Sequence, residues 1–199
     1  MMLQYIIYFV TLINPVAIFV YLLPLKQERG IDDFTRVLIR ASLFTFVIYS
    51  IFALYGEQIF TELLQVEFSS FRVFGGIVLL ALSLNYLVAG KRRFIATKGE
   101  MNEIAAQVAL PYMVGSGTLT MSIIMGRALS KPTAVLSIGA VIAITFAIII
   151  TLALIREGVR KNVKAAFDRN LDIFMRLNGF FVGTIGVDLI VKGIQGFLK

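Results

Sequence analysis

The feature that most constrains this chain is the length of its uncharged apolar segments. Residues 1–25 contain no Asp, Glu, Lys or Arg, and neither do residues 132–155. A helix of about 20 apolar residues crosses the roughly 30 Å hydrocarbon core of a bilayer. Apolar residues make up 58% of the chain and charged residues 16%, whereas soluble domains carry about 25% charged residues. The sequence therefore predicts an integral membrane protein.

The charged residues divide the chain into six apolar segments. We therefore expect an all-α integral membrane fold with six transmembrane helices. The connections between them are short, so residues 1–199 are expected to form a single membrane domain with no soluble part. The expected spans cover residues 1–25, 37–56, 71–90, 104–126, 132–155 and 173–198.

Positive charge is concentrated on one side of the predicted spans. Fourteen of the 19 Lys and Arg residues lie in or beside the first, third and fifth connections. Cytoplasmic loops of membrane proteins carry an excess of Lys and Arg, so we expect a multi-pass protein with these connections in the cytoplasm and both termini outside. The net charge of +7 is then a topology signal. Because no aromatic or glycine-rich RNA-binding motif accompanies it, no nucleic-acid partner is expected.

The two halves of the chain share weak sequence similarity. A shift of 103 residues aligns Asn85 with Asp188, whereas a shift of 104 aligns Arg72 with Arg176. Both registers cannot hold together, and the sequence leaves the choice open. Halves with three spans each must have opposite orientations if they are related, which is a common transporter design. We expect two inverted three-helix repeats, at residues 1–92 and 104–199.

Each half is expected to begin with an interrupted helix. Asn14 and Pro15 interrupt the first span, and Gly115, Ser116 and Gly117 interrupt the fourth. Proline lacks a backbone donor, and glycine adopts angles that other residues resist. Interrupted spans at matching places in two halves indicate a substrate site near the membrane midplane, although each could also be a kink that only helps packing. The predicted substrate-binding residues are Asn14, Pro15, Gly115, Ser116, Gly117, Thr118 and Thr120.

A few charged and amide side chains fall within the predicted spans. Asp188 is the only carboxylate well inside a span, so it is a candidate for coupling to H+ or Na+, with Asn85 at an equivalent depth. The alternative for Asp188 is a helical ion pair with Lys192. Arg72 and Arg176 each begin the third helix of a repeat. They are structural or gating candidates, unless they only extend to the membrane interface.

The composition also excludes several functions. The chain has no Cys and no His, which removes zinc thiolate sites, haem ligation and Ser–His or Cys–His catalysis. It has no pair of intramembrane carboxylates for acid–base chemistry. We therefore expect no enzyme, no metal site and no cofactor, and transport or channel activity remains.

Four motifs, taken together and in this order, resemble those of the MarC family. They are Asn-Pro-Val-Ala at 14–17, Phe-Arg-Val-Phe-Gly-Gly at 71–76, residues 110–120, and Arg-Leu-Asn-Gly at 176–179. The resemblance implies a six-helix inner-membrane protein of the neutral amino acid transporter family, whose members are associated with glycine and alanine and with proposed ion coupling. Ser116 departs from the pattern, since the family usually has Pro there. Its effect is either a softer second break or an additional hydroxyl ligand.

These observations predict a secondary transporter of small neutral amino acids, ion-coupled and working by alternating access. Backbone N–H groups at residues 115–118 are expected to bind the substrate carboxylate, and Asn14 the ammonium group. The alternatives are a channel for small neutral solutes, a multidrug or metabolite exporter, and a membrane scaffold that transports nothing. Expected partners are the amino acid, membrane lipid and a possible second copy of the chain. The glycines at 179 and 183 are expected to form a helix-packing face, within or between chains.

Overall fold

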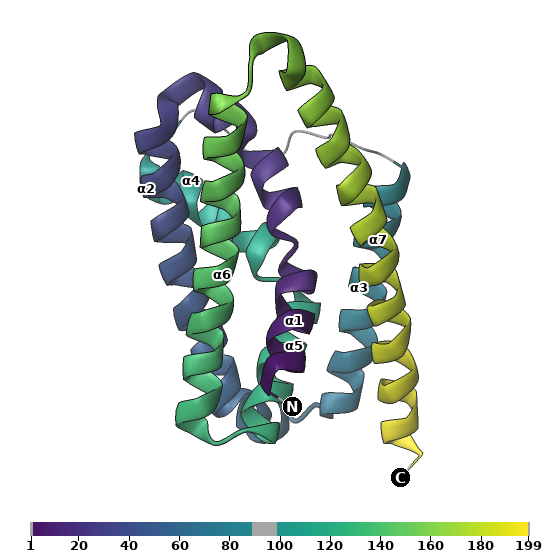
Figure 1. Ribbon diagram of the computed structural model, residues 1–199. Helices are drawn as coiled ribbons and strands as arrows, with labels where there is room; N and C mark the ends of the chain where they lie inside the picture. Colours follow the sequence, from purple (N-terminus) through teal and green to yellow (C-terminus); the bar gives the residue numbers. More distant parts are fainter. Residues whose placement is uncertain (1, 89–98, 199) are drawn as a thin grey trace.

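A computed structural model of the chain describes residues 2–88 and 99–198. Within those residues the fold is all-helical and contains no strand, as the sequence predicts (Figure 1). The predicted end of the first repeat, residue 92, and the end of the third span, residues 89–90, lie outside the described residues. In chain order the helices are α1 (Met2–Ile13), α2 (Pro15–Gln58), the π-helical turn η1 (Ile59–Leu63), α3 (Phe68–Val88), α4 (Met101–Gln107), the π-helical turn η2 (Val108–Met113), α5 (Ser116–Ala128), α6 (Lys131–Gly158) and α7 (Lys161–Phe197).

The helices have the length and surface of a membrane protein. Four helical segments of the described chain are long and apolar enough to cross a bilayer: Met2–Leu63, Phe68–Val88, Lys131–Gly158 and Val163–Phe197. The first of these contains two predicted spans, 1–25 and 37–56, and the predicted span 104–126 is divided among α4, η2 and α5. Large apolar side chains face outward, including Leu84, Leu136 and Phe180. Such a surface is stable against lipid but not against water.

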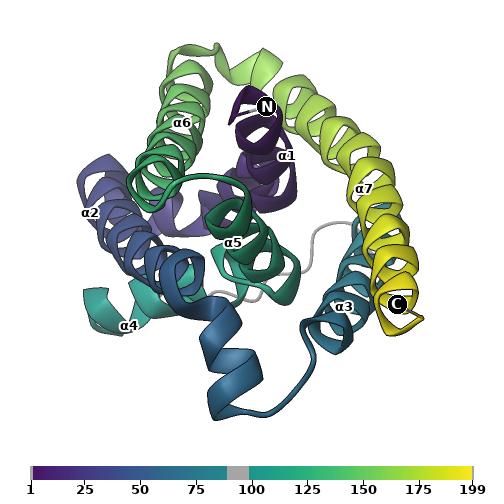
Figure 2. The ribbon, with the colours of Figure 1, turned by 90° about the horizontal axis from the view of Figure 1, so that it is seen from below.

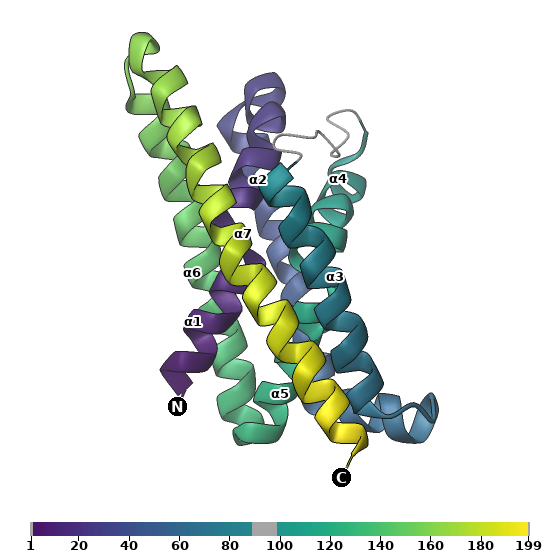
Figure 3. The same cartoon turned by 90° about the vertical axis from the view of Figure 1, so that its right-hand side faces the viewer.

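The broken segments lie inside the bundle. Seen along its length, α1 and α5 lie between a pair formed by α2 and α6 and a pair formed by α3 and α7 (Figure 2). Both chain ends lie at the same end of the molecule (Figure 3). Because α3 runs away from that end and α7 runs towards it, these two helices are antiparallel. The interruptions of α1–α2 and α4–α5 are therefore enclosed by unbroken helices.

Small residues allow α3 and α7 to pack closely. A Cβ atom added to Gly76 would lie 2.4 Å from the carbonyl oxygen of Gly186, so the two backbones are nearly in contact there. The Ser83 hydroxyl donates a hydrogen bond to the Gly179 carbonyl oxygen at 2.8 Å, and a Cβ added to Gly183 would meet Ser83. The predicted packing role of the glycines at 179 and 183 is confirmed, and the partner is α3 of the same chain.

Two stretches expected as polar loops are helical. Residues 156–172 belong mostly to the end of α6 and the first turns of α7, and Arg156 binds Asp168 with hydrogen bonds of 2.8 and 3.0 Å. Residues 26–36 continue α2 except at Gly30 (φ 84°), where the chain reverses. The prediction was wrong there because hydropathy marks where a chain leaves lipid, whereas a helix stabilised by packing continues into water.

Candidate functional site

The first break is centred on Asn14. Its backbone is left-handed (φ 54°, ψ 72°), a conformation that asparagine tolerates better than most residues. Its side-chain oxygen accepts a hydrogen bond from the Ala17 N–H at 3.2 Å and so caps α2. Pro15 occupies the first position of α2, where a missing N–H costs nothing. Asn14 and Pro15 together end one helix and begin the next.

The break frees a backbone acceptor, and α7 supplies a partner for it. In a continuous helix the carbonyl oxygen of Thr11 would accept from residue 15, but Pro15 has no N–H. The Asn178 side-chain amide donates to this oxygen at 3.3 Å. Asn178 was not among the predicted site residues, although its place in the motif at 176–179 was the available signal. An orphan carbonyl is costly in lipid, so Asn178 stabilises the break.

The second break is wider than the first. Leu110, which precedes a proline, is extended (φ −118°, ψ 112°), and Gly115 is extended as well (φ −124°, ψ 169°). The Thr118 hydroxyl accepts from the Gly115 N–H at 2.9 Å and lies 3.2 Å from the Met113 carbonyl oxygen, to which it can donate. Ser116 is the first residue of α5, the same helical position that Pro15 holds in α2. This break thus forms with serine at a position that accepts proline equally well.

A side chain from another helix also stabilises the second break. The Tyr49 hydroxyl of α2 donates to the carbonyl oxygen of Met113, the last residue of η2. The Thr45 hydroxyl lies 3.5 Å from the sulfur of Met113. All three residues are buried. Each break therefore has a freed carbonyl that accepts a hydrogen bond from a distant helix.

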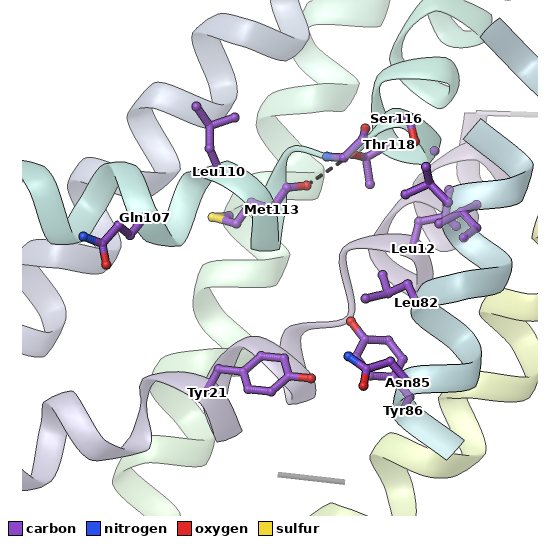
Figure 4. A pocket seen from close by; sticks show the side chains of 14 residues that line it. Leu12, Tyr21, Leu82, Asn85, Tyr86, Gln107, Leu110, Met113, Ser116 and Thr118 are labelled. Carbon is purple, nitrogen blue, oxygen red and sulfur yellow. Dashed lines mark hydrogen bonds between the residues drawn. The ribbon is translucent and has the colours of Figure 1, made fainter. Parts of the chain in front are cut away.

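A cavity of about 510 Å3, which we call the central cavity, lies against the second break (Figure 4). The Ser116 hydroxyl oxygen is buried and has no hydrogen-bond partner among the described residues. The N–H groups of the first turn of α5 have no partner within their own helix. This wall of the cavity therefore combines a buried hydroxyl with a helix N-terminus, and helix N-termini suit an anionic group. The lining residues are Leu12, Tyr21, Val78, Leu79, Leu82, Asn85, Tyr86, Gln107, Leu110, Met113 and residues 115–118.

The predicted substrate-binding residues do not all lie in the central cavity. Asn14 and Pro15 line a separate cavity of about 220 Å3, together with Thr11 and Asn178. Thr120 is fully buried, and its hydroxyl donates to the Ser116 carbonyl oxygen at 2.8 Å. The residues that the structure brings together in the central cavity are Gly115, Ser116, Gly117, Thr118 and Asn85.

A further cavity, of about 610 Å3, lies nearer the chain ends, and we call it the terminal cavity. Its polar lining is Gln4, Tyr5, Tyr8, Arg72, Asp188 and Lys192. Asp188 and Lys192 form the ion pair that the sequence offers as an alternative, with a nitrogen–oxygen distance of 2.8 Å. Arg176 lies elsewhere, and its guanidinium donates to the Leu87 carbonyl oxygen at 2.7 Å. The two predicted ion-coupling residues, Asn85 and Asp188, thus line different cavities.

Within residues 2–88 and 99–198, no three His, Cys, Asp or Glu side chains cluster closely enough to hold a metal ion. The polar groups of the central cavity are amides, hydroxyls and backbone N–H groups, which are suited to hydrogen bonding.

Comparison with known proteins assigns the chain to a family. A family model described as "MarC family integral membrane protein" matches residues 1–198. The chain is similar to the UPF0056 membrane protein PH0214 of Pyrococcus horikoshii, with 27% identity over 87% of this chain and 83% of the relative. It is also similar to the UPF0056 membrane protein YhcE of Escherichia coli, with 23% identity over 93% of this chain and 87% of the relative. No solved structure matches. The chain therefore belongs to the MarC family of integral membrane proteins.

Proposed function

We propose that this protein is a secondary transporter of small neutral amino acids such as glycine and alanine. The observation that carries the proposal is the central cavity, whose wall contains the start of α5 and the buried Ser116 hydroxyl, a group without a hydrogen-bond partner among the described residues. A half-helix N-terminus inside a membrane suits a substrate carboxylate, because the helix dipole is positive there and no water competes. A small zwitterion has such a group.

In this proposal the two ends of the substrate contact different helices. The carboxylate meets the N–H groups at residues 116–118 and the Ser116 hydroxyl. The ammonium group donates to the Asn85 side-chain oxygen on α3, which lines the same cavity. The expected role of Asn14 changes, because Asn14 lies in the smaller cavity and caps α2. Asn14 is now proposed to hold the first break in place.

We further propose six spans arranged as two inverted repeats. Two ion pairs support this arrangement: Lys26 with Glu157 at 3.2 Å, and Arg127 with Glu57 at 3.4 Å. The glutamates differ by 100 residues, and the basic partners by nearly the same number. In each pair a basic residue that lies shortly before a turn meets a glutamate near the end of a helix from the other half. Lys26 precedes the turn at Gly30 in α2, and Arg127 is near the end of α5. Repeats related by a pseudo-two-fold axis in the membrane plane produce this exchange.

Contacts to two backbone carbonyl oxygens follow a 100-residue relation, one residue less than the spacing between Lys26 and Arg127. The Lys26 ammonium donates to the Ala153 carbonyl oxygen, and Gly126 lies directly against the Ala53 carbonyl oxygen. Residues 41–50 and 141–150 also have the same sequence of buried and exposed positions. This register differs from the shifts of 103 and 104 suggested by the third helices. One or more inserted residues before the last helix account for the difference.

The orientation belongs to the same proposal. Both chain ends lie at one end of the bundle, and the turn within α2 and the α6–α7 turn lie at the other (Figure 3). The basic residues near those two turns favour a cytoplasmic location. The central cavity would then lie nearer the cytoplasm and the terminal cavity nearer the outside. In the proposed alternating access, the two repeats rock against each other around the breaks, in the inner membrane and coupled to H+ or Na+.

One observation favours a second candidate. The central cavity, at about 510 Å3, is within the roughly 300–1,000 Å3 range of sites for drug-sized ligands. A metabolite or drug exporter would use the same cavity with a larger occupant. Competition distinguishes the candidates, since a bulky amphipathic compound should displace alanine only from a site that accepts both.

The test is uptake of labelled alanine and glycine into proteoliposomes that contain the purified protein. We expect saturable uptake that increases under an inward H+ or Na+ gradient. Empty liposomes measure leakage, and stopped-flow swelling with glycerol measures channel activity. Fast, non-saturating flux would favour a channel. Failure of every gradient to produce saturable uptake would overturn the transporter proposal.

A further inference from the structure

The terminal cavity carries an unbalanced positive charge. Its lining contains two basic groups, Arg72 and Lys192, and one acidic group, Asp188. Asp188 is already paired with Lys192 at 2.8 Å. Among the described residues Arg72 has no carboxylate within 4.0 Å, and its Nε atom is buried without a hydrogen-bond partner. A cation in a membrane protein normally pairs with another group, so the cavity lacks one anion.

The Arg72 side chain is held in place. Its guanidinium lies over the ring of Phe68, 4.8 Å from the ring centroid. Arg127 approaches the same ring at 5.6 Å. Contacts between cations and aromatic rings are favourable, so the contact with Phe68 restricts the movement of the Arg72 side chain. A guanidinium that is held in place and lines the cavity suits a carboxylate, whose two oxygens match its planar geometry.

We propose that the terminal cavity is a second solute site, in which Arg72 binds the carboxylate of a small amino acid before or after its passage through the central cavity. The class of solute rests on the proposed function, whereas the carboxylate specificity rests on Arg72 alone. Asp188 and the Tyr8 hydroxyl line the same cavity and accept hydrogen bonds from an ammonium group. The Asp188 charge disfavours dianions, so a monovalent carboxylate or a zwitterion fits best.

The location of this site agrees with the proposed repeats. Asn85 lines the central cavity, and Asp188, its equivalent under the 103-residue shift, lines the terminal cavity. Tyr21 and Met121, which differ by 100 residues, likewise line one cavity each. Corresponding positions of the two halves thus form two cavities. The terminal one is charged, and the polar side chains of the described central lining are neutral.

The absence of cysteine from the chain allows a direct test by solute protection. A single cysteine replaces Ile124 in the terminal cavity, and in a second protein one replaces Val78 in the central cavity. Each purified protein in nanodiscs is labelled with a charged maleimide, with and without alanine, propionate or alaninamide. We expect alanine and propionate to slow labelling of I124C, by about tenfold at ten times Kd. Alaninamide, which lacks the carboxylate, should give no protection.

The Arg72→Gln substitution should abolish protection of I124C, and Arg72→Lys should retain part of it because the charge remains. The matched control is Arg36→Gln, which removes an exposed arginine of α2 that does not line the terminal cavity and should leave protection unchanged. Labelling rates without solute and gel-filtration profiles verify that each variant is folded. The proposal is overturned if I124C is not labelled, if propionate gives no protection, or if protection persists in Arg72→Gln.

The outcomes separate this site from transport. If alanine uptake is absent while propionate still protects I124C through Arg72, the terminal site stands and the transporter proposal fails. If uptake is saturable but I124C is not protected, the terminal site fails alone. Protection of V78C should be independent of Arg72, because Val78 lines the central cavity.

Discussion

The two helix breaks differ in the size of the cavity that lies beside each of them. At the first break, the Asn14 side-chain oxygen caps α2 and Asn178 binds the carbonyl oxygen of Thr11. At the second, Tyr49 binds the Met113 carbonyl oxygen. Each break also keeps one buried side-chain group that has no hydrogen-bond partner among the described residues: the Asn14 amide nitrogen, beside a cavity of about 220 Å3, and the Ser116 hydroxyl, beside the central cavity of about 510 Å3. Similar sequence signals therefore produce one break beside a small cavity, which we call the closed break, and one beside a larger cavity, which we call the open break. In a membrane, where unsatisfied groups are costly, the open break is the better candidate for a ligand.

The largest expected effect concerns access to the open break. A Cβ atom on Gly117 would lie 2.6 Å from the side chain of Leu79, so Gly117→Val should fill the narrow space between α5 and α3. We expect alanine uptake in proteoliposomes to fall to the level of empty liposomes. Gly139→Val is the matched control, since its nearest neighbour is the Phe46 ring at 3.6 Å. Uptake by the folded Gly117→Val protein at the wild-type rate would show that the open break is not on the substrate path.

The closed break should instead determine stability. Asn14→Ala removes the helix cap and places alanine in a left-handed conformation, so we expect the free energy of unfolding to fall by about 1–2 kcal/mol. Asn14→Gly tolerates the conformation and should cost only a few tenths of a kcal/mol. Unfolding of both variants in mixed detergent micelles measures the difference. Equal losses in the two variants would contradict the role of the left-handed backbone.

The opposite behaviour is expected at Ser116. Because its hydroxyl has no hydrogen-bond partner in the part of the chain that the structure describes, Ser116→Ala should change the free energy of unfolding by less than about 0.5 kcal/mol. Loss of one hydrogen bond to substrate, worth about 1 kcal/mol, should raise the KM for alanine about fivefold. Steady-state uptake and micelle unfolding measure the two quantities. An unchanged KM would remove Ser116 from the proposed site.

The smallest effect tests the contact between Asn178 and the first break. Asn178→Leu should cost about 0.6 kcal/mol, the average for hydrogen bonds between membrane helices. In a Pro15→Ala background the new N–H can bind the Thr11 carbonyl oxygen, so the same substitution should cost less. A double-mutant cycle on unfolding free energies isolates this coupling. If the losses of unfolding free energy from the two substitutions are additive, the Asn178 side chain does not stabilise the Thr11 carbonyl oxygen.

The sequence predicted a large part of the fold. The membrane class, the apolar segments and the interruptions near Pro15 and Gly115 all follow from local signals. Lipid contains no water to replace a missing backbone hydrogen bond, so every interruption of a helix costs free energy and needs particular residues. Residues 156–172 were predicted incorrectly. Their charges indicate water, but helices also persist in water when they pack against neighbours, as Arg156 and Asp168 do across the α6–α7 turn.

The candidate site was less predictable than the fold. The sequence placed Asn14 and Ser116 in one site, whereas they line separate cavities. It missed Asn178, which meets Thr11 across 167 positions of the chain, and Tyr49, which meets Met113 across 64. Hydropathy and glycine or proline spacing describe neighbours along the chain and contain no information on such distant contacts.

By itself, the sequence determined that this protein lies in a membrane, where its helices break and which family it resembles. Only the tertiary structure decided which break is closed and which cavity each polar residue lines. The physical reason is that breaking a helix is a local event, governed by the missing N–H of Pro15 or the extended backbone of Gly115. The carbonyl oxygens that a break leaves without a partner accept hydrogen bonds from whichever distant helix packs beside the break, as those of Thr11 and Met113 do.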